Sequence, residues 1–144
     1  MASVEYVSGP RGEIVLAQEG ATAGSFVAGD LVKTNSSGQV ILGTAGKIYG
    51  IARKSAAAVT GTVTPVELIN VDAIYRIRYQ TGATALTQVG ALADITYTAG
   101  AHVVDDTTPT TNEIEIVSHD TVDAIGTSGG RLFVRFRPSI YAAR

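Results

Sequence analysis

The chain contains two histidines, His102 and His119, each followed closely by aspartates that could share a metal ion with it. Those aspartates are Asp105, Asp106, Asp120 and Asp123. A metal site requires three or four converging ligands, and these residues lie in turn-like segments without a known ligand spacing. We therefore interpret them as loop residues that satisfy turns, and we expect neither a metal nor a cofactor.

Several common catalytic arrangements have no counterpart in the sequence. There is no Cys for a thiol nucleophile or a disulfide, no phosphate-binding Gly-x-x-x-x-Gly-Lys loop and no Gly-x-Gly-x-x-Gly turn. Glu113 and Glu115 are a candidate carboxylate pair, but strand alternation places both on a solvated face. Neither then gains the burial that raises a carboxyl pKa. We therefore expect a protein that is not an enzyme.

Arginines recur at alternate positions of two predicted strands. Arg76 and Arg78 share one face of the first strand, and Arg131, Arg135 and Arg137 share one face of the second. Arg suits planar, bidentate pairing with the carboxylates of a partner, although an ordinary solvated sheet face is the alternative. With a formal net charge of −2 and few aromatic residues, the chain is not expected to bind nucleic acid.

Both ends of the chain carry isolated apolar or aromatic residues. Residues 1–12 are predicted to form an N-terminal arm that contains Val4 and Tyr6, and Tyr141 lies in the C-terminal tail. Such residues are candidate contacts with another subunit, because exposed aromatic anchors are favoured at interfaces and extended termini can pair by strand addition. A frayed terminus is the alternative interpretation.

The body of the chain, residues 13–144, is predicted to be one all-β domain. Short runs rich in β-branched residues alternate with Gly-containing turns, and three of them show a clear period of two. The predicted strands are Glu13 to Ala17, Leu31 to Thr34, Val40 to Leu42, Ile48 to Ala52, Thr62 to Asn70, Ile74 to Gln80, Ile95 to Thr98, Ile114 to Val117 and Leu132 to Arg137. We expect a compact antiparallel β-barrel or sandwich with at most one short helix, near Arg53 to Val59.

Length and composition indicate how many domains the chain forms and how much of its surface partners cover. At 144 residues the chain fits one domain, and only 17% of its residues are charged, against about 25% in typical soluble domains. A surface of Thr, Ala and Gly is easily desolvated, so we expect partners to cover much of it. Neither a secretory signal nor a membrane span is expected.

The order of turn glycines and strand hydrophobes resembles a family of small β-rich decoration, or cement, proteins of tailed-phage heads. The motifs that carry this resemblance lie between Ala17 and Tyr97. In chain order they are Gly29-Asp30-Leu31-Val32, the Asn35-Ser36-Ser37-Gly38 hairpin, Val40, Gly50-Ile51-Ala52 with its Ala-rich loop, Val63-Thr64-Pro65-Val66-Glu67-Leu68, Ala85-Leu86, Gly90-Ala91-Leu92 and Ile95-Thr96-Tyr97.

The resemblance implies a β-tulip-like domain that forms homotrimers on the outside of an expanded icosahedral shell. Its partners would be the major capsid protein and other copies of itself, and clamping adjacent capsid subunits would stabilise the shell. The location implied is the capsid exterior, after synthesis in the host cytoplasm. The family has no catalytic residues to transfer.

Two other classes of function stay open. Trimeric dUTP hydrolases are all-β and of similar length, but they require an acidic residue in a Gly-rich uracil-binding hairpin and a phosphate-binding arm. A carbohydrate-binding tail module would present exposed Trp or Tyr platforms, and this chain contains no Trp.

Overall fold

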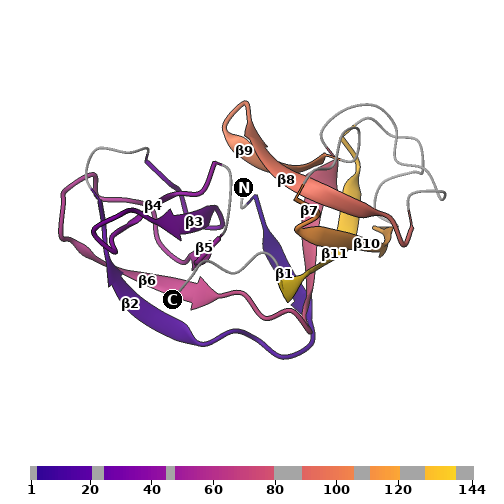
Figure 1. Ribbon diagram of the computed structural model, residues 1–144, viewed down its shortest axis with the longest axis horizontal. Coiled ribbons are helices and arrows are strands. Elements are labelled where there is room, and N and C mark those ends of the chain that lie inside the picture. Colours follow the sequence, from indigo (N-terminus) through magenta and orange to yellow (C-terminus); the bar gives the residue numbers. More distant parts are fainter. Residues whose placement is uncertain are drawn as a thin grey trace.

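The computed structural model describes residues 3–20, 25–44, 48–79, 89–105, 111–120 and 129–138. Over these ranges the chain forms eleven β-strands in two sheets, which confirms the all-β prediction. Figure 1 shows two lobes side by side, the first built from β2 to β6 and the second from β7 to β11, with β1 alongside β7. Within the described ranges no helix is long and apolar enough to span a membrane.

The first lobe is a five-stranded antiparallel sheet in the order β2-β6-β5-β3-β4. Its strands are β2 Ile14–Gln18, β3 Leu31–Thr34, β4 Val40–Leu42, β5 Gly50–Ala52 and β6 Val63–Leu68. A parallel bridge between Glu19 and Val40 joins the end of β2 to β4, so the sheet rolls towards closure. Its inner face buries a small cluster around Phe26, Val32 and Val66.

The hairpin between β3 and β4 is the turn that the sequence predicts at Asn35 to Gly38. The Asn35 Oδ1 atom accepts hydrogen bonds from the amides of Ser37 and Gln39, both at 2.9 Å. Gly38 has a φ of 77°, a left-handed conformation that glycine adopts without strain. The side chain of Asn35 therefore fixes the register in which β3 and β4 pair.

The second lobe is a closed barrel. Its strands are β7 Ile74–Tyr79, β8 Leu92–Thr98, β9 Ala101–Asp105, β10 Ile114–His119 and β11 Arg131–Phe136, in the order β7-β11-β10-β8-β9. A parallel pairing of β9 with β7 closes the ring. Strand β1, Glu5–Ser8, lies in the segment predicted as an arm and pairs antiparallel with β7 of the same chain.

The two lobes share a hydrophobic core. Leu31, Ile48 and Ile51 belong to the first lobe, yet they are buried in one cluster with barrel residues such as Tyr75 and Val104. Leu31 and Ile51 face each other across β3 and β5, so their side chains lie on the same face of the sheet. The part of that face formed by β3 and β5 is therefore buried against the barrel.

Because the core is shared, we expect the described sheets to unfold together. Leu31 is completely buried, and Leu31→Ala should lower the free energy of unfolding by about 2–5 kcal/mol by leaving a cavity between the lobes. Ile14→Ala, at an exposed side chain, is the matched control and should change stability by less than about 0.5 kcal/mol. Urea denaturation followed by circular dichroism and tyrosine fluorescence measures both, and two separate transitions in the wild type would contradict a shared core.

Candidate functional site

The arginines predicted at alternate positions form what we call the basic stripe: Arg76, Arg78, Arg131, Arg135 and Arg137. It lies on the outer face of β7 and β11. Arg78 pairs directly with Arg131 in the register of these strands, and Arg76 pairs with Phe133. The Arg76 guanidinium contacts the Glu5 carboxylate through two nitrogens, and its Nη1 donates to Asp120 Oδ2 at 3.0 Å. Hydrogen bonds to Glu5 and then to Asp120 raise the pKa of Arg76. Arg76 on β7 is therefore tied both to β1 and to the residue that follows β10.

The other predicted arginines differ in their exposure and in their hydrogen-bond partners. Arg78 is exposed and donates to the carbonyl of Gly129 at 3.2 Å. Arg135 is exposed and lies opposite Glu115 across β10 and β11. The half-buried Arg137 donates to the carbonyl oxygen of a loop residue, Asn112, at 3.2 Å. The stripe is thus a partly neutralised face of the barrel.

The predicted contacts at the chain ends have different surroundings. Val4 is 3% exposed and packs into the shared core, so its side chain is not on the surface of a single chain. Tyr6 is half-buried, packs edge-to-face on Tyr75 with ring centroids 6.3 Å apart, and donates its hydroxyl hydrogen to the Gly9 carbonyl. Tyr141 lies outside the described residues.

His102 is a buried strand residue, and its prediction as a loop residue is wrong. It lies in β9 with 1% exposure, where Nε2 is hydrogen-bonded to the Gly43 carbonyl at 2.8 Å and Nδ1 lies 3.4 Å from the Leu31 amide nitrogen. His119 is the last residue of β10. Over the described ranges no three His, Asp or Glu residues are grouped so as to hold a metal ion. The His102 ring instead connects the barrel to the first lobe.

Glu113 is buried, which corrects its predicted place on a solvated face. Strand β10 begins only at Ile114, and Asn112 has a positive φ of 53°, so Glu113 lies just before the strand and does not follow the strand alternation. Its Oε2 accepts a hydrogen bond from the Ile95 amide at 3.1 Å. Burial raises the pKa of the Glu113 carboxyl, although hydrogen bonds from Thr111 and Ile95 act in the opposite direction. This carboxyl ties the start of β10 to β8.

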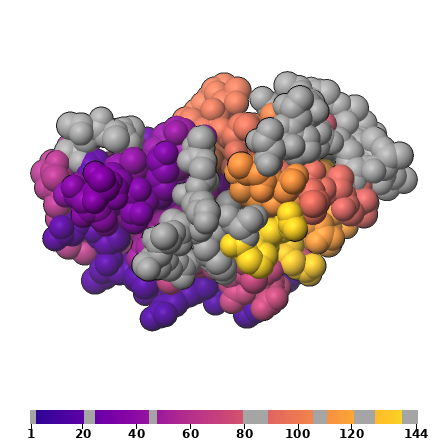
Figure 2. Space-filling view, viewed as in Figure 1, coloured from indigo at the N-terminus to yellow at the C-terminus, as the bar shows by residue number. Residues whose placement is uncertain are grey.

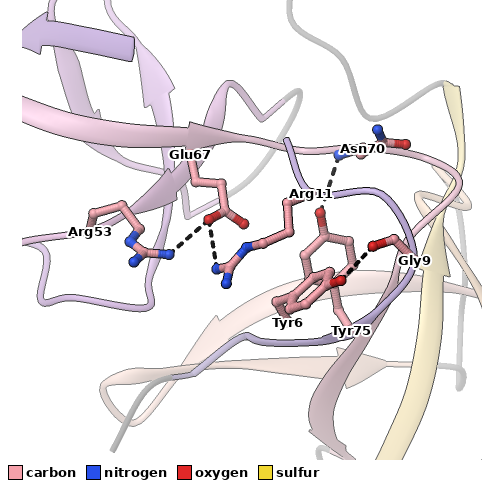
Figure 3. Close-up of polar contacts among 7 residues, drawn as sticks. All are labelled: Tyr6, Gly9, Arg11, Arg53, Glu67, Asn70 and Tyr75. Atoms are coloured by element: carbon pink, nitrogen blue, oxygen red, sulfur yellow. Dashed lines mark hydrogen bonds and ion pairs between the residues drawn. The ribbon is translucent and has the colours of Figure 1, made fainter. Parts of the chain in front are cut away.

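A pocket of about 300 Å³ opens where the N-terminal segment crosses the first sheet. Among its lining residues are Val4, Tyr6 and Ile51, together with the charged side chains Arg11 and Arg53, Glu5 and Glu67. Glu67 is 2% exposed, and its Oε1 accepts from Arg11 Nη2 and from Arg53 Nη1, both at 2.8 Å. Figure 3 shows the two arginines reaching this carboxylate from opposite sides.

Sequence reasoning selected Val4 and Tyr6 of this pocket but none of its charged residues. The signal available was Glu67 itself, a single charge inside the apolar run from Val63 to Leu68. A lone carboxylate in a buried strand requires hydrogen-bonding partners. Its partners lie 56 and 14 positions away in the chain, so no local pattern indicates them.

An exposed apolar surface continues from the pocket over β2 and β6. Ile14 lies opposite Glu67, Leu16 lies opposite Pro65, and Val63 lies opposite Gln18, so all these side chains share one face. Ile14, Leu16 and Val63 are 55%, 74% and 55% exposed. We call these three residues and Pro65 the β2–β6 apolar face. Figure 2 shows the N-terminal part of the chain, in indigo, along the lower surface of the molecule.

No protein-family model matches the chain, and a search of curated proteins also finds no match.

The buried Glu113 predicts a pH dependence of stability. Because its pKa is raised above the ordinary value of 4.5, the folded protein binds this proton more tightly than the unfolded chain does. Its contribution to stability is thus complete below pH 4.5 and is lost as the pH rises through the folded pKa. The side chain introduced by Glu113→Gln cannot ionise. The free energy of unfolding of this variant should therefore increase relative to that of the wild type as the pH rises through the folded pKa.

Urea denaturation of both proteins between pH 4 and pH 7 measures this difference. Glu115→Gln removes a carboxylate from a half-buried position on β10 and is the matched control. The Glu113→Gln protein and the wild type should differ in free energy of unfolding by an amount that grows with pH. A constant difference would contradict the raised pKa of the buried Glu113 carboxyl.

Proposed function

We propose that this protein is a non-enzymatic structural component of a phage particle. It binds the outer surface of the capsid as a homotrimer and stabilises the shell by clamping adjacent major capsid subunits. The motif order that resembles the head-decoration family supports this proposal, as does the all-β fold. The observation that carries it is the β2–β6 apolar face, a surface suited to docking.

The exposure of this face is unusual for a monomer surface. Leu16 is a large aliphatic side chain that is 74% exposed on a regular strand, between two further exposed aliphatic residues on the same face. Contiguous apolar surface of this kind, bordered by charged residues, marks protein interaction sites. Covering one such side chain contributes about 1.5–3 kcal/mol. The face thus supplies association energy without any buried charge.

Strand β2 also offers an edge for backbone pairing. The Leu68 amide donates to Glu13 and the Glu19 amide donates to Thr62, so odd-numbered residues of β2 form the hydrogen bonds to β6. The amides and carbonyls of Ile14 and Leu16 therefore point away from β6. Within the described part of the chain, β2 has only β6 and the Glu19 bridge as partners. An extended segment of a neighbouring protein can add to such an edge.

The proposed role follows from general binding thermodynamics. A protein that binds the assembled shell, and not its dissociated subunits, stabilises the shell by mass action. Three linked copies that engage together convert weak single contacts into high avidity. A modest apolar face on each copy is therefore sufficient to hold a trimer on the capsid.

The test is binding of the purified protein to expanded heads of its own phage. The wild type should sediment as a trimer in analytical ultracentrifugation and co-sediment with the heads. Leu16→Asp should weaken binding by at least about tenfold per copy, because it removes an apolar side chain and buries a charge.

Val89→Asp is the matched control, since Val89 is 44% exposed but precedes β8 in the other lobe. This variant should bind as the wild type does. A monomeric wild type that fails to co-sediment would contradict the proposed function. Equal binding of the Leu16→Asp protein and the wild type would show that the β2–β6 apolar face is not the contact.

A further inference from the structure

The pocket beside Glu67 has the features of a receptor for one acidic side chain. We propose that Arg11 and Arg53 together bind a carboxylate of the protein on which the β2–β6 apolar face docks. The stem of that acidic residue would pack against Val4 and Ile51 inside the pocket. The proposal rests on the proposed function for the identity of the partner, which is the major capsid protein, but the pocket chemistry can be tested without it.

The arginine hydrogen-bond donors in the pocket favour an anionic ligand. Two guanidinium groups share the single carboxylate of Glu67, and both converge on the same oxygen, Oε1. The second carboxylate lining the pocket, Glu5, is already paired with Arg76 outside it. Arg76 is itself shared between Glu5 and Asp120, so the charges of these linked groups balance, and the pocket offers an anion the unused N–H donors of Arg11 and Arg53. Each arginine has five N–H donors and presents the remaining ones to an incoming carboxylate, the ligand that its planar fork fits best.

The two arginines are positioned before any ligand arrives. Their side chains are 50% and 41% exposed, but the buried Glu67 holds one end of each. Arg11 also lies over the Tyr6 ring, with its guanidinium carbon 4.4 Å from the ring centroid. Tyr6 is itself fixed by Tyr75 and by the Gly9 carbonyl (Figure 3). A preorganised pair loses less conformational entropy on binding than two free arginines would.

Close backbone contact places Arg11 over the pocket. A Cβ atom at Gly12 would lie 1.5 Å from the carbonyl oxygen of Leu68, so only glycine lets the chain run this close to β6. The Leu68 amide also donates to the Glu13 carbonyl at 2.8 Å. The segment that carries Arg11 is thus held against the same strand that carries Glu67.

The pocket is continuous with the β2–β6 apolar face. This continuity indicates which residue types a partner surface must combine. Ile51, Glu67 and Ile14 form one row across β5, β6 and β2. Arg53 follows in the next row, since its amide donates to the carbonyl of Pro65, which is opposite Leu16. A complementary partner therefore carries an acidic side chain directly beside apolar ones. We infer a Glu or Asp flanked by aliphatic residues.

Two blocked dipeptides test this recognition on the full-length protein. N-acetyl-Leu-Glu-amide should shift the NMR signals of the Arg11 and Arg53 side-chain N–H groups and of the Ile51 methyl groups, and the shifts should saturate. N-acetyl-Leu-Gln-amide has the same shape without the charge and should bind at least about tenfold more weakly, the effect of losing one charge-assisted hydrogen bond. Added salt should weaken only the binding of the glutamate peptide.

Matched variants assign the effect to the pocket. Arg53→Gln should reduce affinity for the glutamate peptide by about tenfold. Lys54→Gln removes the same charge from an exposed neighbouring position that does not line the pocket, and it should leave affinity unchanged. Arg11→Gln is a second variant outside any strand, so the sheets remain intact if Arg53→Gln perturbs folding.

Equal affinity for the two peptides would overturn the proposal, as would equal losses in the Arg53→Gln and Lys54→Gln proteins. Shifts confined to residues away from the pocket would overturn it as well. Heads that fail to bind the wild type, while the glutamate peptide still binds, would remove the proposed function and leave the acidic-residue receptor in place.

Discussion

The buried carboxylate of Asp30 is the contact on which the arrangement of the two lobes depends. It accepts hydrogen bonds from the Ser3 hydroxyl at 2.7 Å and the Val27 amide at 3.0 Å, and His102 Nδ1 of the barrel lies 3.7 Å away. Burial alone would raise the pKa of Asp30, but His102, Val27 and Ser3 outweigh it and hold the pKa below its ordinary value. The N-terminal segment, the first sheet and the barrel thus meet at one charge, which is stabilised only when all three are in place.

This junction determines which part of the first sheet is left for a partner. Along one row of the sheet, Leu31, Ile51 and Glu67 are 0%, 5% and 2% exposed, whereas Ile14 at the β2 end is 55% exposed. The barrel and the N-terminal segment cover one end of the face and leave the other bare. The two-arginine pocket lies at the boundary between them, where buried apolar surface changes to exposed apolar surface. A partner that covered the bare end would extend the core that the barrel begins.

Local sequence patterns were sufficient for much of the strand content. The bounds of β3 and β4 agree with prediction, because β-branched runs and the Asn35 turn fix them locally. Strands β1 and β9 were not predicted. Strand β1 pairs with β7, a partner distant in sequence, whereas β9 pairs mainly with its neighbour β8 and closes the barrel on β7. Periodicity also assigned Glu113 to the wrong environment, because it assumes that a strand continues through every alternating residue.

The sequence by itself determined the all-β class, the hairpin at Asn35 and the outer positions of Arg76 and Arg78, because these depend on turn chemistry and on the two-residue period of a strand. Only the tertiary structure decided that the chain forms two lobes with a shared core and that Glu67 gathers Arg11 and Arg53. A buried charge specifies that it must have partners, but not which ones. Those are selected by strand pairings between residues far apart in the chain, and no local pattern encodes them.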